Sequence, residues 1–228
     1  VMDLGPCLPR MKAAYNGPQT FLNLRDGTML AMLHGASELN DGDSIYTWGA
    51  THCMGCAYRS TDDGLTWSGP IEIDNRGDDE RGDHIGSNMD LTEMCAAEVD
   101  DGVIMGLIRP IYSPWMWETW SEDGGQTWSA CMRGPFAGYA TPNMLRTSSG
   151  AVIVAHRLPT LTVHCSLDGG VHWDNGTMID SGAWVMGAMI EAEPDLVLYV
   201  YWETFDGPMR AQFLRVTASG LQPQRRDG

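Results

Sequence analysis

Short apolar segments separated by turn residues recur four times along the chain. In each unit a first segment ends in a turn and a strongly apolar segment follows: residues 19–27 and 28–33, 94–102 and 103–109, 142–150 and 151–156, and 185–193 and 196–201. Segments of this length without helical periodicity are typical of β-strands. The pattern therefore predicts an all-β chain with four similar units. Two more strands complete each unit, the last of them expected at 66–73, 127–132 and 172–179 in the first three.

The first three units also share the pattern Ser-x-Asp-x-Gly-x-x-Trp, placed between two apolar runs. An Asp side chain can accept hydrogen bonds from the N–H groups of a tight turn, Gly adopts positive φ, and Trp packs on the next strand. The spacing of the copies suits one four-stranded propeller blade per copy. We therefore expect the three aspartates to be structural. They are Asp62, Asp123 and Asp168.

This pattern resembles the Asp-box, or BNR repeat, of the sialidase (neuraminidase) superfamily. The resemblance implies a β-propeller of four-stranded blades, about four in this chain against six in the complete family fold. We expect residues 1–228 to form one such domain that lacks N-terminal blades. Two alternatives stay open: the chain closes as a small propeller, or its open blade edges associate with a second copy or another protein.

Composition narrows the function classes. The 228 residues carry a formal net charge of −16, from 14 basic and 30 acidic residues, so the average field repels nucleic acids and anionic membranes. No apolar run is long enough for a membrane span, and residues 1–17 do not resemble a signal peptide. We expect no nucleic-acid partner and no membrane insertion, and the cellular location stays open.

The sequence offers little for a metal or cofactor. Cys53 and Cys56 are the one close pair among six cysteines, and neither a second pair nor histidines at ligand spacing accompany them. Free thiols are the preferred interpretation. The chain also has no glycine-rich phosphate loop, so we expect neither a metal nor a cofactor.

Residues 91–109 resemble a segment of exo-sialidases in which a Glu opens one strand and an Arg ends the next. In that family the Glu activates a nucleophilic Tyr, and the Arg is one of three that clamp the substrate carboxylate. The matching residues are Glu93 and Arg109. The hairpin pattern alone also places both near one end, and a guanidinium binds a carboxylate bidentately. A local salt bridge on the surface is the alternative.

A second clamp candidate follows in the next unit. Arg157 resembles the third clamp Arg of sialidases in its placement, whereas His156 alternates to the other face of the strand and is expected to be structural. Trp184 stands where the family has its nucleophilic Tyr, and it would serve as a sugar-stacking platform or as a packed core residue. Tyr139 could approach the site from a neighbouring blade.

Other parts of the family's site have no clear counterpart. The first clamp Arg and the acid Asp are not matched, although Arg10, Asp41 and Asp43 are of the right types. A glycosidase needs a pair of carboxyl groups, one as acid and one as base or nucleophile. Glu93 is the first candidate. Glu191, Glu193 and Glu203 are the next candidates. Glu203 follows Trp202 where sialidase-like chains have Tyr-Glu, and this resemblance implies that Glu203 orients another site residue.

These residues predict a glycoside hydrolase-like protein that acts on a terminal sugar of a glycan. An acidic sugar is favoured because Arg109 and Arg157 would hold its carboxylate, with Glu93 as base. Two alternatives remain: a carbohydrate-binding propeller without catalysis, and an interaction scaffold whose open blade edges close on a partner.

Overall fold

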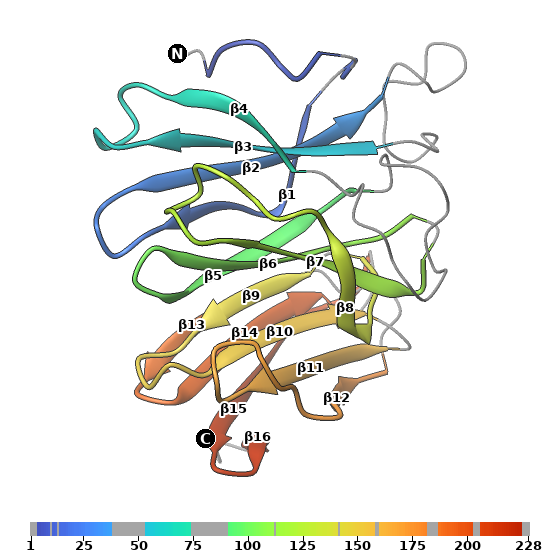
Figure 1. Cartoon of the computed structure of the whole chain (residues 1–228). Helices are drawn as coiled ribbons and strands as arrows, with labels where there is room; N and C mark the ends of the chain where they lie inside the picture. The colour runs from blue at the N-terminus through green and yellow to red at the C-terminus, as the bar shows by residue number, and fades with distance from the viewer. Residues whose placement is uncertain are drawn as a thin grey trace.

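The computed structural model describes residues 4–9, 11–12, 14–37, 53–73, 91–111, 113–140, 142–157, 160–181, 187–202 and 206–224. Every regular element in these ranges is a β-strand, which confirms the predicted all-β class. The strands form four four-stranded antiparallel sheets, here called blades 1 to 4. Figure 1 shows blades 1, 2 and 3 following one another in chain order, while blade 4 overlaps blade 3 in this view. The described ranges contain no helix with the length and apolar character that crossing a bilayer requires.

In each blade the strands are ordered as they occur in the chain. Blade 1 contains β1 (Tyr15–Asn23), β2 (Met29–Ala36), β3 (Cys53–Ser60) and β4 (Ser68–Ile73). Blade 2 contains β5 (Met94–Asp100), β6 (Val103–Ile108), β7 (Trp115–Ser121) and β8 (Met132–Ala137). Blade 3 contains β9 (Asn143–Arg146), β10 (Val152–Arg157), β11 (Leu161–Ser166) and β12 (Thr177–Asp180). Blade 4 contains β13 (Gly187–Glu193), β14 (Leu196–Trp202), β15 (Met209–Thr217) and β16 (Gly220–Gln224).

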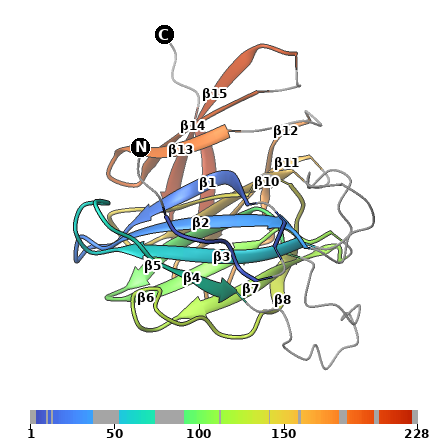
Figure 2. The ribbon, with the colours of Figure 1, turned by 90° about the horizontal axis from the view of Figure 1, so that it is seen from above.

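The first strand of each blade contacts the first strand of the next, in the order β1, β5, β9 and β13. Viewed from above in Figure 2, the strands of blade 4 are turned away from the direction of those in blade 1. The blades therefore fan around the side that their first strands share. This is the arrangement of consecutive propeller blades.

The hydrophobic core lies between the blades, and the second strands of blades 2 and 3 contribute to the interfaces with both neighbouring blades. In β6, Ile104 and Ile108 pack toward blade 1, whereas Met105 and Leu107 pack toward blade 3. Successive side chains of a strand point to opposite faces, so a strand buried on both faces must be apolar throughout. This explains why the second segment of each unit is strongly apolar in sequence.

Two amide side chains bind successive blades together near the shared side. Gln19 of β1 donates to Ala96 O at 2.7 Å in blade 2 and accepts from Met144 N at 2.9 Å in blade 3. Asn143 of β9 accepts from Met189 N at 3.2 Å in blade 4. Each bond satisfies a backbone group that no strand partner reaches, so the amides fix neighbouring blades relative to one another.

Two buried or half-buried glutamates clasp the turn ends of the blades. Glu98 accepts from Arg25 N at 2.8 Å, in the first turn of blade 1, and from Gly102 N at 3.0 Å in its own blade. Glu191 accepts from Ser148 N in blade 3 and Asp195 N in blade 4, both at 2.8 Å. This contact places Glu191, a candidate acid from the sequence, at the turn end of its blade.

The Ser-x-Asp-x-Gly-x-x-Trp turns join the third and fourth strands of blades 1 to 3, and their hydrogen bonds are local. In blade 1, Gly64 N donates to Ser60 Oγ at 2.9 Å, and Asp62 accepts from Thr66 N at 2.8 Å and from Thr66 Oγ1 at 2.6 Å. These bonds lower the pKa of Asp62. Asp123 and Asp168 make the corresponding bonds to residues 127 and 172.

The last strand of blade 2 begins later than the sequence predicts, at Met132 instead of residue 127. Trp120 N donates to the side chain of Ser129 at 3.0 Å, while Ser129 N donates to Trp120 O at 2.7 Å. The Ser129 hydroxyl thus replaces a backbone acceptor and interrupts the ladder. The same segment of blade 3 also starts late, at Thr177. Hydrophobic pattern alone does not show where such a side chain replaces a strand partner.

Candidate functional site

The second strand of every blade delivers one residue to the same end of the molecule. Each blade turns from its first strand to its second at a residue of positive φ, 89° at Gly27, 67° at Gly102, 99° at Gly150 and 59° at Asp195. Counting seven positions onward from each turn gives the far end of the second strand (27 to 34, 102 to 109, 150 to 157, 195 to 202). The four residues, here called the mouth residues, are His34, Arg109, Arg157 and Trp202.

Glu93 and Arg109 lie opposite each other, where β5 begins and β6 ends. Arg109 N donates to Glu93 O at 2.9 Å, which extends the antiparallel ladder by one pair. Arg109 Nη1 lies 3.1 Å from Glu93 Oε2 in a hydrogen-bonded ion pair. Both side chains are half-buried. The hairpin therefore brings together the two residues that the sequence placed near one end.

Tyr139 connects blade 2 with blade 3 at this place. Arg109 Nη2 donates to the Tyr139 hydroxyl at 2.9 Å, and the guanidinium carbon lies 4.4 Å from the centre of the Tyr139 ring. Arg157 N donates to Tyr139 O at 3.1 Å. Tyr139 therefore contacts both candidate clamp residues, through its side chain in one case and its backbone in the other.

The two arginines influence each other's protonation. The pKa of Arg157 is lowered by burial and next by the positive charge of Arg109, against the opposing effects of Glu93 and Tyr139. For Arg109, burial alone would lower the pKa, but Glu93 and Tyr139 outweigh it and raise the pKa. The four groups are thus close enough to interact electrostatically. An anion placed beside both guanidinium groups would reduce their repulsion.

His34 belongs to the same cluster, and sequence reasoning missed it. Its side chain is buried, and burial lowers its pKa to about 4, with Glu93 acting to raise the pKa and Arg109 to lower it. A neutral imidazole therefore borders the ion pair near neutral pH. One signal could have identified His34: it is the seventh residue after its turn, as Arg109 and Arg157 are after theirs.

Some sequence-predicted residues cannot be placed with this cluster. Trp184 and Glu203 lie outside the described residues, as do Arg10, Asp41 and Asp43. Glu193 is exposed two residues before Asp195, at the turn end of β13 that Glu191 also occupies. Since Arg157 ends β10 at the other end of the blades, neither of these two glutamates lies with the arginines.

The described residues offer no group of three or more His, Cys, Asp or Glu side chains that could hold a metal ion. Cys53 and Cys56 are buried free thiols on β3, and burial raises the pKa of Cys56 to about 12. A protonated thiol is a poor metal ligand. The cluster itself brings together two guanidinium groups, a carboxylate, a phenol and a neutral imidazole.

Comparison with known proteins adds information about the fold. No family model and no curated protein matches the chain. Among solved structures, a protein of unknown function from Dyadobacter fermentans is similar with a TM-score of 0.64 and 17% identity, over 87% of this chain and 52% of that one. A Hadza microbial sialidase is similar with a TM-score of 0.58 and 19% identity, over 84% of this chain and 36% of that one. The chain has a sialidase-like fold.

An α-L-arabinofuranosidase from Fusarium graminearum is also similar, with a TM-score of 0.54 and 12% identity, over 94% of this chain and 66% of that one. The chain spans about half the length of the Dyadobacter protein and about a third of the length of the Hadza sialidase. At these identities the likeness shows a shared fold and nothing of activity.

Proposed function

We propose that this chain is a sialidase-related, glycoside hydrolase-like protein that takes a terminal acidic sugar of a glycan. The observation that supports this proposal is the mutual approach of Arg109, Arg157, Glu93 and Tyr139 at one end of blades 2 and 3. Fold analogy with glycan-processing enzymes points the same way but is weaker support. The Asp-box assignment of the three turns belongs to the same proposal.

Arg109 and Arg157 would bind the carboxylate of the sugar. A planar guanidinium offers two parallel donors to a carboxylate, and two such groups give orientation as well as affinity. The chain as a whole carries a net charge of −16, which disfavours anions. An anionic ligand therefore needs a local concentration of positive charge, and this pair of arginines provides it. The Tyr139 hydroxyl would add a donor or acceptor for a sugar hydroxyl.

Glu93 would act as the base in catalysis. It accepts a charge-assisted hydrogen bond from Arg109, and the role of acceptor suits a base better than an acid. A glycosidase also needs a proton donor to the leaving oxygen. Glu203 is our candidate for this second carboxyl group. Trp184 in place of the family Tyr implies that the chemistry differs from that of true sialidases, with the indole as a sugar platform.

A carbohydrate-binding protein without catalysis is the second candidate function. The observation that favours it is the Glu93–Arg109 ion pair, because a carboxylate held by a clamp arginine is less available to activate a nucleophile. In this case the same arginines bind the sugar and no bond is cleaved. A third role, association with a second copy or another protein, is supported by the exposed apolar face of blade 4, which includes Ile190 and Met209.

Two measurements on one set of variants separate these functions. We would measure hydrolysis of aryl glycosides of acidic sugars, and binding of N-acetylneuraminic acid by calorimetry. A hydrolase loses turnover in Glu93→Gln, whereas a binding protein keeps its affinity in Glu93→Gln and loses it in Arg109→Ala. Arg25→Ala is the matched control, because it removes one positive charge at the turn end of blade 1. Equal affinity in Arg109→Ala and Arg25→Ala would contradict both.

A further inference from the structure

Trp202 occupies in blade 4 the place that Arg109 and Arg157 occupy in blades 2 and 3. It is the last residue of β14, the seventh after the positive-φ residue Asp195. Its side chain is 42% exposed, which is unusual for a tryptophan at a strand end beside two buried tyrosines of the same sheet. Its exposure needs an explanation that packing within blade 4 does not supply.

The direction of the side chain follows from alternation along the strand. In β14 the odd-numbered residues 197–201 pack in the core shared with blade 3, so Trp202 points to the opposite face. In β10, Ile153 packs toward blade 4, and Arg157 lies on the same face as Ile153. Trp202 and Arg157 therefore point in the same sense around the fan of blades, each from the mouth end of a second strand.

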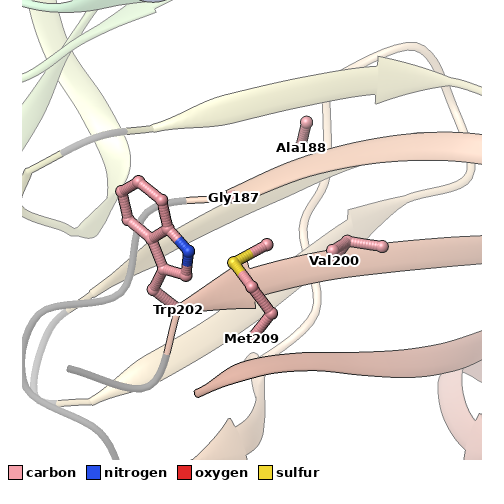
Figure 3. Close-up of a pocket in the computed structure, with 5 residues that line it drawn as sticks. All are labelled: Gly187, Ala188, Val200, Trp202 and Met209. Atoms are coloured by element: carbon pink, nitrogen blue, oxygen red, sulfur yellow. The ribbon is translucent and has the colours of Figure 1, made fainter. Parts of the chain in front are cut away.

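A hollow of about 300 Å³ lies beside the indole, and Figure 3 shows the residues around it. Its lining is formed by Gly187, Ala188, Val200, Trp202 and Met209. Ala188 carries only a methyl group, which leaves open space next to the indole ring, whereas a side chain at Gly187 would point to the other face of the sheet, against Tyr199. None of the described residues that line the hollow carries a charge. The neighbouring Arg210 is ion-paired with Asp180 at 2.8 Å and takes no part in it.

We infer that Trp202 is a further substrate-contact residue, whose indole stacks on the apolar face of a sugar ring. This inference rests on the proposed function. The occupant is the second ring of the same glycan, adjacent to the acidic ring that Arg109 and Arg157 hold. Carbohydrate rings present C–H groups on one face, and an aromatic platform with an apolar surround binds such a face while the ring hydroxyls remain in water.

The position of Trp202 in the series of mouth residues supports a second sugar ring as the occupant. Ligand sites combine a mostly apolar wall with a few polar groups that fix orientation. The guanidinium groups of blades 2 and 3 would fix the acidic ring, and the hollow on blade 4 continues the series of mouth residues in the next position. A terminal ring at the arginines thus leaves the second ring to extend toward Trp202. The indole would then select for a disaccharide over a single sugar.

The test compares a disaccharide with a monosaccharide. Calorimetric titrations with 3′-sialyllactose and with N-acetylneuraminic acid would use wild type, Trp202→Ala, Trp202→Phe, Ile190→Ala and Arg109→Ala. We expect Trp202→Ala to weaken 3′-sialyllactose binding by roughly tenfold and to change the monosaccharide affinity by less than about twofold. Trp202→Phe should retain most of the affinity. Ile190→Ala is the matched control, since Ile190 is an exposed apolar residue of β13 in the same blade.

The outcomes separate the two proposals. If Arg109→Ala loses binding of both sugars while Trp202→Ala binds both like wild type, the stacking role is wrong and the acidic-sugar site stands. If wild type binds neither sugar, the proposed function fails and the stacking role fails with it. Sedimentation of the same variants tests whether a protein surface binds this face of blade 4. A change of mass in both Trp202→Ala and Ile190→Ala, without any change of affinity, would show that a protein surface covers this face instead.

Discussion

Blades 1 and 4, at the two ends of the fan, each have an apolar outer face, and the described residues cover only one of them. Blade 1 presents an apolar face away from blade 2, and residues near the N-terminus cover it: Leu8 and Met11 are 7% and 9% exposed in one cluster with Tyr58. The Tyr58 hydroxyl also donates to Pro6 O at 2.8 Å. Blade 4 presents its corresponding face uncovered among the described residues, with Ile190 62% and Met209 57% exposed.

This difference concerns how far the described residues cover each outer blade face. Covering an apolar blade face with another segment stabilises the fold by about 25 cal/mol for each Å² of apolar surface removed from water. The N-terminal segment stabilises blade 1 in this way. On the face of blade 4 the described residues leave Ile190 and Met209 exposed, and exposed apolar surfaces of proteins often contact other segments or ligands. The comparison can be tested by substitutions on both faces.

The largest expected effect concerns the covered interfaces, where histidines are buried. Burial lowers the pKa of His156 to about 3, and that of His34 to about 4. A folded-state pKa below the ordinary value of about 6.5 means that the unfolded chain binds the proton more readily. Stability should therefore be fully present above about pH 6.5 and be lost as the pH falls toward 3. The loss would be roughly 3 to 5 kcal/mol per histidine.

His156→Phe tests this pH dependence, because Phe can join the stack that His156 forms with Phe136 and His164. Urea unfolding between pH 7 and 4 should show a shallower decline of the unfolding free energy than in wild type. His172→Thr is the control: His172 is 85% exposed, and Thr occupies the same place in the other two turns. A decline that is unchanged in His156→Phe would contradict the prediction.

The second effect compares the cover of blade 1 with the open face of blade 4. Leu8→Ala removes buried methyl groups from the N-terminal cover and should lower the free energy of unfolding by about 2 to 3 kcal/mol. Ile190→Ala removes exposed groups and should change it by less than about 0.5 kcal/mol. Equal losses in urea unfolding would mean that the face of blade 4 is covered in solution.

The third effect compares the glutamates that clasp turn ends. Glu98→Gln weakens a buried acceptor of two backbone N–H groups and should cost about 1 to 2 kcal/mol in unfolding free energy. Glu191→Gln, in a more exposed place, should cost about half as much. Guanidinium unfolding of both variants gives the ratio. A larger loss for Glu191 would show that blade 4 depends on its clasp more than its exposure suggests.

The smallest effect concerns a charge on the open face. Ile190→Lys should leave the unfolding free energy within about 0.5 kcal/mol of wild type and raise the concentration at which the protein aggregates. Met11→Lys, the counterpart under the N-terminal cover, would bury a charge and should unfold the cover. Light scattering at increasing protein concentration tests Ile190→Lys. The rate of proteolysis near the N-terminus tests Met11→Lys.

Much of the fold could be predicted from the sequence, because its signals are local. Turns of positive φ at Gly27, Gly102, Gly150 and Asp195, each followed by an apolar strand, define the four units. The start of β8 was not predictable, because the Ser129 side chain takes a ladder bond from Trp120. A hydroxyl group that replaces a backbone acceptor leaves no trace in the hydrophobic pattern.

The candidate site was predictable where its residues share one hairpin and less so where they come from different blades. Glu93 and Arg109 face each other across β5 and β6, so hairpin register places them together. His34 comes from another blade, and a single histidine in an apolar strand resembles a core residue. Glu191 has the residue type of a catalytic acid, but it binds turn N–H groups at the opposite end. Residue type does not show which end of a blade a side chain faces.

The most direct test of the central claim is the affinity of N-acetylneuraminic acid compared with that of its methyl ester, in wild type and in Arg109→Ala. The ester keeps the ring and loses the negative charge. If Arg109 and Arg157 bind the carboxylate, the ester should bind wild type at least about tenfold more weakly, and Arg109→Ala should remove most of this difference. Equal affinity for acid and ester in wild type, or the same difference in Arg109→Ala, would contradict the account.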